Sequence, residues 1–280
     1  MTSGVLDDII PTMSWHELLN FDRRIPEENI LLSRQYERKI DGFFPTPVIL
    51  AEGPFDVTAI DINPGSKTTN RTPELDKYID DVWNKLIFKE GKDIYNNDKV
   101  LVLEVVTENN RLKISTGLTD YKTRIATTRD LEISKKYGFE AIAVTLGTAC
   151  LLKTGDNKLV LAQLGKTTSE ANKIGGLHCI GGFLEVENKL PIDITQNLKQ
   201  EIKEELGLTE SETDNQINVN YCLGVVQDNN TYAVDILFVC TTNLRVNELK
   251  TRNGDGEIKP VFINNSEKEV TETLLAFSKT

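Results

Sequence analysis

Three glutamates crowd a short stretch of the chain, at positions 201, 204 and 205. Residues three and four apart on an α-helix share one face, so a helix through this stretch places the three carboxylates on one sector. Like charges at this spacing destabilise a helix unless something offsets their repulsion. Mg²⁺ does so well, because it prefers oxygen ligands and usually keeps several waters and substrate phosphates. Glu201, Glu204 and Glu205 are therefore candidate ligands of a divalent cation.

The neighbouring residues indicate how these glutamates are held. Leu198, Ile202 and Leu206 form an apolar stripe beside them, which predicts an amphipathic helix. Gly207 stands where a left-handed residue ends a helix, and the following leucine is expected to fold back onto that helix. A solvated acidic face is the alternative interpretation in a chain of net charge −11. The upstream pair Gly181-Gly182 favours a site, because glycines let the backbone approach a phosphate or metal closely.

Together these pieces resemble the Nudix box, whose pattern is G-x5-E-x7-R-E-U-x-E-E-x-G-U, with U a bulky aliphatic residue. Residues Glu201 to Leu208, read as E-I-K-E-E-L-G-L, match its second half. Gln200 stands where the pattern has arginine, and the span from Gly182 to Glu201 is four residues longer than the pattern. The candidates for the central glutamate of the pattern are therefore Glu185, Glu187 and Asp193.

The chain is similar, more narrowly, to the atypical Nudix hydrolases that cleave UDP-glucose and UDP-galactose, over roughly residues 53 to 263. That subfamily also carries glutamine before the first glutamate and a lengthened loop after the glycine pair. Both departures from the general box therefore favour it. The residues that carry the similarity are Asp56-Val57-Thr58, Trp83, Gly117-Leu118-Thr119, Tyr121, Leu159-Val160-Leu161, Gly181-Gly182, Gln200-Glu201-Ile202, Glu204 and Glu205.

The resemblance implies an α/β fold, a Nudix α/β/α sandwich about a mixed sheet, preceded by a smaller α+β domain. We expect an extension over residues 1–46, the α+β domain over 47–136 and the Nudix domain over 137–280. The first half would pack on the Nudix domain and help to shape the substrate pocket.

Hydrophobic patterning places the elements. Apolar residues at spacings of three and four predict a helix that starts at Pro73 and ends near Gly91. Another helix is expected over 269–277, and turn-rich loops over 63–72 and 116–122. Runs rich in β-branched residues predict strands at 48–50, 57–62, 99–106, 111–115, 141–152, 159–164, 217–227, 232–241 and 261–263.

Composition excludes several classes of function. The net charge of −11 argues against general binding of nucleic acid or an anionic membrane, which needs a basic surface. Apolar runs stay well short of the roughly 20 residues that span a bilayer, and residues 1–8 lack the features of a signal peptide. The four cysteines are scattered without C-x-x-C spacing, which argues against a zinc site and disulfides. We expect a cytoplasmic protein.

The resemblance also implies a reaction: Mg²⁺-dependent hydrolysis of the UDP-sugar pyrophosphate to UMP and a sugar 1-phosphate, with Mn²⁺ as a possible substitute. Glu201 and Glu205 would be the principal metal ligands, and Glu204 would complete the cluster or act through water. A further carboxylate outside the helix assists in this family as ligand or base. Glu257 is the first candidate for that role and Asp228 the second.

Substrate contacts are expected from both halves of the chain. Gly181 and Gly182 would approach the phosphates through their backbone, and Lys166 and Lys122 are available cations, with Tyr121 beside the latter. The expected partner is a small nucleotide sugar, and the oligomeric state is open. Two alternatives remain: a Nudix hydrolase of ADP-ribose or another nucleoside diphosphate derivative, and an inactive binding module, which the glutamine and the lengthened loop favour.

Overall fold

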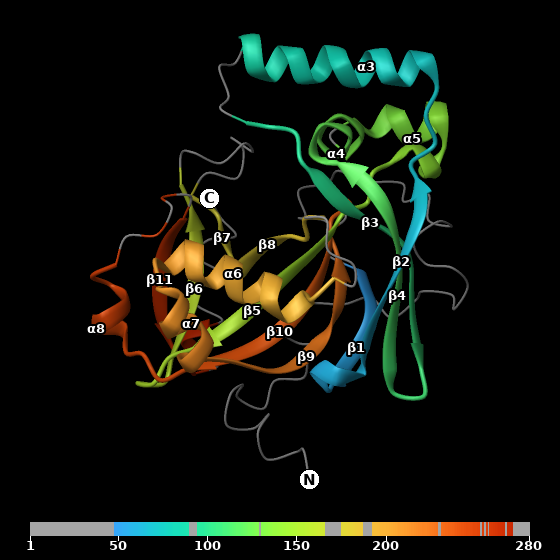
Figure 1. Cartoon of the computed structure of the whole chain (residues 1–280). Helices are drawn as coiled ribbons and strands as arrows, with labels where there is room; N and C mark the ends of the chain where they lie inside the picture. The colour runs from blue at the N-terminus through green and yellow to red at the C-terminus, as the bar shows by residue number, and fades with distance from the viewer. Residues whose placement is uncertain are drawn as a thin grey trace.

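Two β-sheets organise the chain in the computed structural model (Figure 1). The structure describes residues 48–89, 94–128, 130–165, 175–186, 192–228, 231–252, 254, 256, 258–266 and 268–270. The expected extension over 1–46 and nearly all of the expected helix over 269–277 lie outside these residues.

The larger sheet is mixed. Its eight strands follow the order β1-β9-β10-β5-β6-β11, with β7 beside β6 and β8 beside β5. β10 and β5 run parallel, whereas β1 with β9 and β6 with β11 run antiparallel. The predicted α/β class with a mixed sheet is confirmed. The bounds are β1 Val48–Phe55, β5 Leu146–Lys153, β6 Lys158–Leu164, β7 Leu177–His178, β8 Ile180–Phe183, β9 Ile217–Gln227, β10 Val234–Thr242 and β11 Ile258–Asn264.

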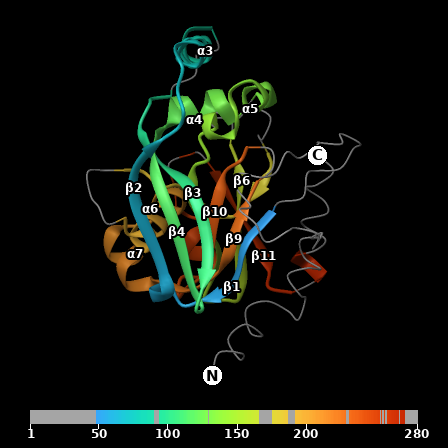
Figure 2. The same cartoon turned by 90° about the vertical axis from the view of Figure 1, so that its right-hand side faces the viewer.

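The smaller sheet has the order β2-β4-β3 and lies beside β1, as Figure 2 shows. Its strands are β2 Ile60–Thr68, β3 Asp98–Glu108 and β4 Arg111–Asp120. Asn109 and Asn110 join β3 to β4 with φ angles of 50° and 58°. Positive φ at both residues makes the tight turn that suits the twist of a hairpin, and asparagine tolerates it well. This turn connects the two strands that the sequence predicts over 99–106 and 111–115.

Helices cover one end of the small sheet and one face of the large sheet. In Figure 1, α3, α4 and α5 lie beyond the small sheet, and α6 and α7 lie across the large one. The bounds are α3 Pro73–Asn84, α4 Tyr121–Thr128, α5 Leu131–Tyr137, α6 Ile194–Leu206, α7 Glu210–Gln216 and α8 Val246–Leu249. A π-helical turn, Lys85–Lys89, continues α3, and short 3-10 turns span Val57–Ala59 and Phe139–Ala141.

Helix α6 forms as its sequence predicts. The Asp193 carboxylate accepts hydrogen bonds from the backbone N–H groups of Thr195 and Gln196, both at 3.0 Å, and so caps the first turn. Gly207 ends the helix in the left-handed region at φ 63°. The N–H of Leu208 then donates to the carbonyl of Lys203 at 2.9 Å, which is the expected return onto the helix.

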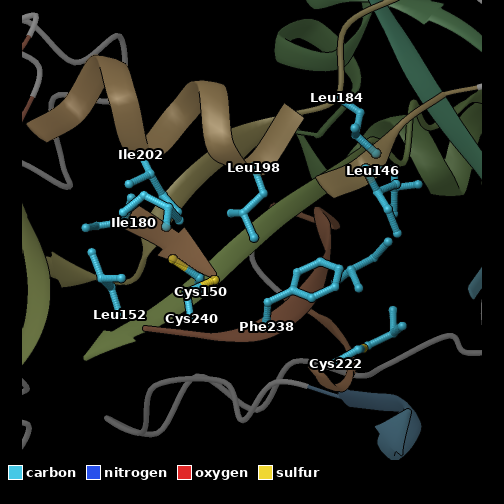
Figure 3. Packing of buried hydrophobic residues seen from close by; sticks show 14 of the residues in the cluster. Leu146, Cys150, Leu152, Ile180, Leu184, Leu198, Ile202, Cys222, Phe238 and Cys240 are labelled. Atoms are coloured by element: carbon cyan, nitrogen blue, oxygen red, sulfur yellow. The ribbon is translucent and has the colours of Figure 1, made fainter. Parts of the chain in front are cut away.

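The core lies between α6 and the large sheet, where Leu198 and Ile202 point from the helix toward the strands (Figure 3). The same cluster includes Leu112 and Ile114 of β4, together with Phe238 of β10. The two sheets thus share one hydrophobic core, and β1 pairs with β9 although the sequence assigns it to the first domain. The domain boundary at residue 137 stays a prediction.

Several expected boundaries are wrong. β2 continues to Thr68 through the expected loop over 63–72, because backbone pairing with β4 holds a stretch whose side chains are mostly exposed. The expected loop over 116–122 is instead the end of β4 and the start of α4. The apolar run over 141–152 contributes a regular strand only from Leu146. In each case long-range pairing or packing overrides the local pattern.

The four cysteines are free; Cys150, Cys222 and Cys240 are buried, as is common for small apolar side chains, and Cys179 is partly exposed. Among the described residues, no helix has the length and apolar character needed to cross a membrane.

The contact of α6 with the sheet predicts a large effect of one core substitution. Leu198 is fully buried, so Leu198→Ala removes buried methyl groups and leaves a cavity, which typically costs about 2–5 kcal/mol. Urea unfolding monitored by circular dichroism should show this loss. Gln196→Ala, an exposed position on the same helix, is the matched control and should stay within about 0.5 kcal/mol of the parent. An equal effect of both variants would contradict the packing described here.

Candidate active site

The three glutamates of α6 differ in environment. Glu204 is exposed and Glu201 is half-buried, whereas Glu205 retains only 7% of its accessible surface. Glu201 and Glu205 are one helical turn apart, so they are neighbours along the helix surface. Glu205 is thus the most buried of the three carboxylates.

The carboxylate of Glu201 lies directly against Gly182. A methyl carbon placed on Gly182 would be 2.5 Å from Cδ and from both carboxylate oxygens of Glu201. Only a residue without a side chain leaves room for the carboxylate here. The first and second halves of the predicted box therefore meet in space, although many residues separate them in the chain.

A hydrogen bond fastens the helix to the sheet at the same level. Gly182 of β8 pairs with Thr148 of β5. The Thr148 hydroxyl donates to the side-chain oxygen of Asn197 on α6, at 3.1 Å. Asn197 is one helical turn before Glu201, so this bond helps to fix the height at which Glu201 faces Gly182.

Gly181 is required for a different reason. Its φ angle of 152° lies outside the range that side chains favour. A methyl carbon at this position would also be 2.7 Å from the Cα atom of Ala149 on the neighbouring strand. Gly181 thus serves the pairing of β8 with β5, whereas Gly182 makes room for a carboxylate.

Gln200 occupies the place of the arginine of the box and contacts the cluster. Its side-chain amide donates a hydrogen bond to the Glu204 carboxylate, one turn further along α6. This neutral donor orients Glu204 without cancelling its charge.

Cysteine chemistry is unsuited to this region. Burial raises the pKa of Cys179, two residues before Gly181, to about 11, and the negative charges of Asp235 and Glu205 add to the effect. The thiol therefore stays protonated at neutral pH and is a poor nucleophile.

The loop before β11 passes over the end of α6. A methyl carbon on Gly254 would be 2.9 Å from the carbonyl oxygen of Glu204 and 2.7 Å from the carbonyl carbon of Glu205. This close approach joins the loop to the backbone of the two glutamates. Sequence reasoning missed it, although the Gly254-Asp255-Gly256 run is a signal for a tight backbone passage.

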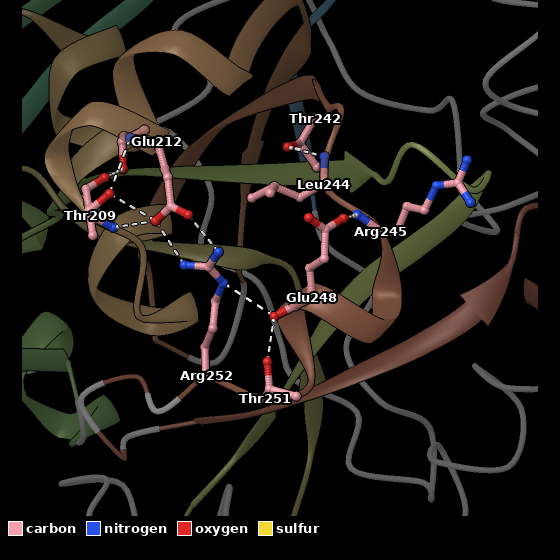
Figure 4. A network of polar contacts seen from close by, with 9 residues as sticks. Thr209, Glu212, Thr242, Leu244, Arg245, Glu248, Thr251 and Arg252 are labelled. Atoms are coloured by element: carbon pink, nitrogen blue, oxygen red, sulfur yellow. Dashed lines mark hydrogen bonds and ion pairs between the residues drawn. The ribbon is translucent and has the colours of Figure 1, made fainter.

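A paired arginine holds this loop in place (Figure 4). The Arg252 guanidinium donates to both carboxylate oxygens of Glu212, at 2.8 and 2.6 Å. Glu212 also accepts from the backbone N–H of Thr209 at 2.9 Å, within the capping box that starts α7. The Arg252 Nε donates in turn to the carbonyl of Glu248 at 3.2 Å. The loop is thereby tied to α7, which follows α6 directly.

The other side of β8 is held by the first half of the chain. Lys99, whose side chain is 7% exposed, forms an ion pair with Glu185, and the Asn97 amide also donates to Glu185. The guanidinium of Arg124 lies 4.1 Å from the centre of the Phe183 ring. Of the three candidates for the central glutamate of the box, Glu185 is thus engaged with Lys99.

The other candidates for the central glutamate, and Asp228, the second candidate for the assisting carboxylate, belong to separate segments of the chain. Asp193 is the cap of α6, and Glu187 lies outside the described residues. Asp228 accepts a hydrogen bond from the Thr231 hydroxyl at 2.8 Å, in the connection between β9 and β10.

Two predicted substrate contacts lie at the start of α4. The Tyr121 ring packs edge-on against Trp83, with the centroids 6.3 Å apart. Lys122 forms an ion pair with Asp80 of α3. The other two predicted residues, Lys166 and Glu257, lie outside the described part of the chain. The roles of all four residues stay predictions.

The donor set suits a hard cation. Within the described part of the chain, no group of three His, Cys, Asp or Glu side chains is arranged to hold a metal. Mg²⁺ requires less, because one or two carboxylates are enough when waters and substrate phosphates complete its six ligands. Glu201 and Glu205 supply carboxylate oxygens one turn apart, and Gly182 leaves the space that Glu201 needs. These residues fit a Mg²⁺ or Mn²⁺ ion.

Comparisons with known proteins give distant matches only. No family model matches the chain, and no curated protein does. A NUDIX hydrolase from Nitrosomonas europaea is 15% identical, over 49% of this chain and 78% of that one, with a TM-score of 0.34. A mutT/nudix family protein from Listeria innocua is 18% identical over 48% and 89%, with a TM-score of 0.32.

A bifunctional NMN adenylyltransferase/ADP ribose pyrophosphatase from Francisella tularensis is 12% identical, over 46% of this chain and 36% of that one, with a TM-score of 0.33. The chain is thus similar to these three solved structures. Their identities and TM-scores are too low to assign a family or an activity to it.

The two glycines predict opposite outcomes for the same substitution. Gly182→Ala should leave the fold intact but displace the Glu201 carboxylate, because the group that must move is the end of a flexible side chain. Mn²⁺ binding measured by electron paramagnetic resonance should weaken by about 10-fold or more, the range seen when groups that orient metal ligands are lost.

Gly181→Ala is the matched control, since its obstacle is the backbone of the next strand. This variant should lose thermal stability first. Unchanged Mn²⁺ affinity in Gly182→Ala would contradict the contact between the two halves of the box.

The Arg252–Glu212 pair predicts a pH-dependent stability difference. Arg252, with help from Thr209, lowers the pKa of Glu212 from 4.5 to about 2. A lowered pKa in the folded state contributes stability above the ordinary pKa, and this contribution disappears as the pH falls through the lowered value. Arg252→Met should therefore melt at a lower temperature than the parent at pH 7, and the two melting temperatures should converge between about pH 4.5 and 2.

Lys259→Met, which removes an exposed cation on β11, is the control and should show no such convergence. A constant difference between Arg252→Met and the parent from pH 7 to pH 2 would show that Arg252 acts by packing alone.

Proposed function

We propose that the chain is a divalent-cation-dependent hydrolase that cleaves the pyrophosphate bond of nucleoside diphosphate sugars, with UDP-glucose and UDP-galactose as the expected substrates. One observation carries the proposal: the Glu201 carboxylate lies against Gly182, with the buried Glu205 one turn further along α6. Carboxylates one turn apart on a helix repel each other, and a bound cation would offset that repulsion.

The residues of the chain have separate tasks in this reaction. Glu201 and Glu205 hold the cation, and Glu204, oriented by Gln200, completes the acidic face directly or through water. When bound, the cation neutralises the pyrophosphate and lowers the pKa of a bound water. The backbone of Gly181 and Gly182 approaches the phosphates, with UMP and a sugar 1-phosphate as products.

Further roles rest on the resemblance. Glu257 is proposed as the base or an additional ligand; it follows Gly254, which lies against the backbone of Glu204 and Glu205, by three positions in the sequence. Asp228 is the second candidate, at a turn between strands. Lys166, Lys122 and Tyr121 are proposed to contact the substrate.

Two alternatives are tested by the same experiment. A hydrolase of ADP-ribose or another nucleoside diphosphate derivative would use the same carboxylates with a different pocket. A binding module without activity is favoured by Gln200 in the place of the arginine and by the lengthened loop after Gly182.

Substitution of the metal ligands tests the reaction class. Glu201→Gln and Glu205→Gln keep the shape of the side chain and remove its charge, so the fold should persist. Turnover should fall by more than about 100-fold, because loss of a ligand exceeds the 10–100-fold effect of losing a group that only orients one. Lys199→Gln, on the solvent side of the same helix, is the control and should keep parental turnover.

The assay is phosphate release from UDP-glucose with Mg²⁺ and a phosphatase specific for monophosphates, run beside ADP-ribose. Release from UDP-glucose that EDTA abolishes would support the proposal. Phosphate release from ADP-ribose alone would support cation-dependent hydrolysis but would contradict UDP-sugars as the substrates. No release from either substrate, or full activity of both glutamine variants, would contradict the hydrolase.

A further inference from the structure

Arg124 is a buried cation outside the predicted box. It belongs to α4, retains only 3% of its accessible surface, and lies among helix residues that are themselves buried, from Thr123 to Thr128. Its guanidinium lies 4.1 Å from the centre of the Phe183 ring and 6.0 Å from that of Tyr121. A planar guanidinium that stacks on a ring at this distance makes a favourable cation–π contact, stronger when water is excluded.

Phe183 connects this contact to the acidic face of α6. It directly follows Gly182 in β8, and the two residues pair with Gly147 and Thr148 of β5. The Glu201 carboxylate lies against Gly182, with no side chain between them. A shift of Phe183 along or away from β5 therefore moves the surface that Glu201 contacts.

Hydrogen bonds fix the helix that carries Arg124 on either side of this residue. The Thr127 hydroxyl of the same helix accepts a hydrogen bond from the backbone N–H of Ala143 at 3.0 Å. At the start of α4, the N–H of Thr123 donates to the Asp120 carboxylate at 2.7 Å. The helix is thus tied both to β4 and to the segment that leads into β5. The backbone that carries Arg124 is therefore fixed relative to β4 and to the segment that leads into β5.

The face that Arg124 covers also carries a carboxylate. In the large sheet Asp235 pairs with Gly147, which pairs with Phe183. Paired residues share a face, and a methyl carbon on Gly147 would overlap the Asp235 oxygen. The side chains of Asp235 and Phe183 thus flank a position without a side chain.

We infer that Arg124 is a positioning residue for the candidate metal site: through Phe183 it holds Gly182 in the place that orients the Glu201 carboxylate. The helices of the first half then act on the site through one stacked contact. As far as turnover is concerned, the inference rests on the proposed function; the binding of a divalent cation tests it separately.

The test is a double-substitution cycle of Arg124→Met and Phe183→Leu, read by Mn²⁺ affinity and by kcat and KM for UDP-glucose. Each single variant should weaken Mn²⁺ binding and lower kcat by about 10-fold, as loss of an orienting group does, with KM within about twofold. Since both residues act through one contact, the double variant should be no worse than the worse single variant. Arg124→Lys, which keeps the charge and loses the planar face, should recover only part of the affinity.

Lys136→Met is the matched control, because Lys136 also lies over a ring, 4.8 Å from the centre of Tyr137, but on exposed α5. It should leave both readouts unchanged. Parental Mn²⁺ affinity in Arg124→Met, or additive losses in the double variant, would overturn the inference.

If Arg124→Met does not fold, as judged by circular dichroism, Phe183→Leu alone decides: weakened Mn²⁺ binding supports the inference and parental binding overturns it. A parent chain that binds Mn²⁺ but hydrolyses neither UDP-glucose nor ADP-ribose refutes the proposed function only. In that case the Mn²⁺ affinities still decide the role of Arg124. A parent chain that binds no Mn²⁺ overturns the inference.

Discussion

The contact between the Glu201 carboxylate and the bare backbone of Gly182 is the constraint on which the candidate site depends. It requires α6 to lie at a fixed height and distance above β8, and the core supplies both, since Leu198 and Ile202 pack on the sheet while Asn197 bonds to Thr148. Apolar burial sets the distance but is not directional. The directional hydrogen bond between Thr148 and Asn197 fixes where along β8 the Glu201 carboxylate lies.

The chain predicts the parts of this site better than their assembly. The helix and its end at Gly207 are readable from local chemistry, and both form, whereas Asp193, a candidate for the central acid of the box, is the cap of the helix. The mixed α/β class also follows from the alternation of strand and helix patterns. Strand bounds set by pairing are predicted poorly. β2 extends to Thr68 with mostly exposed side chains, so its sequence shows no alternation of apolar and polar residues that would predict a strand there.

Contacts between distant segments leave no local signal at all. The pairing of Arg252 with Glu212 joins residues 40 positions apart, and only the capping-box half of it can be read from the sequence. Arg124 reads as one more available cation on a polar connection, yet it belongs to a buried helix. The charge pattern of the sequence cannot distinguish a solvated arginine from one that lies over an aromatic ring. The difference depends on whether the fold places a ring, here that of Phe183, against the guanidinium.

The distribution of charge explains why an acidic face can persist beside a hydrophobic core. Cations near α6 are directed elsewhere: Lys203 pairs with Glu210 at 2.7 Å and Arg252 with Glu212. Within the box itself Gln200, a neutral donor, orients Glu204. Had an arginine stood there, part of the acidic charge would be cancelled in the resting protein. With glutamine in its place the charge of Glu204 is retained, so the face of α6 that carries the three glutamates stays more acidic than it would with arginine.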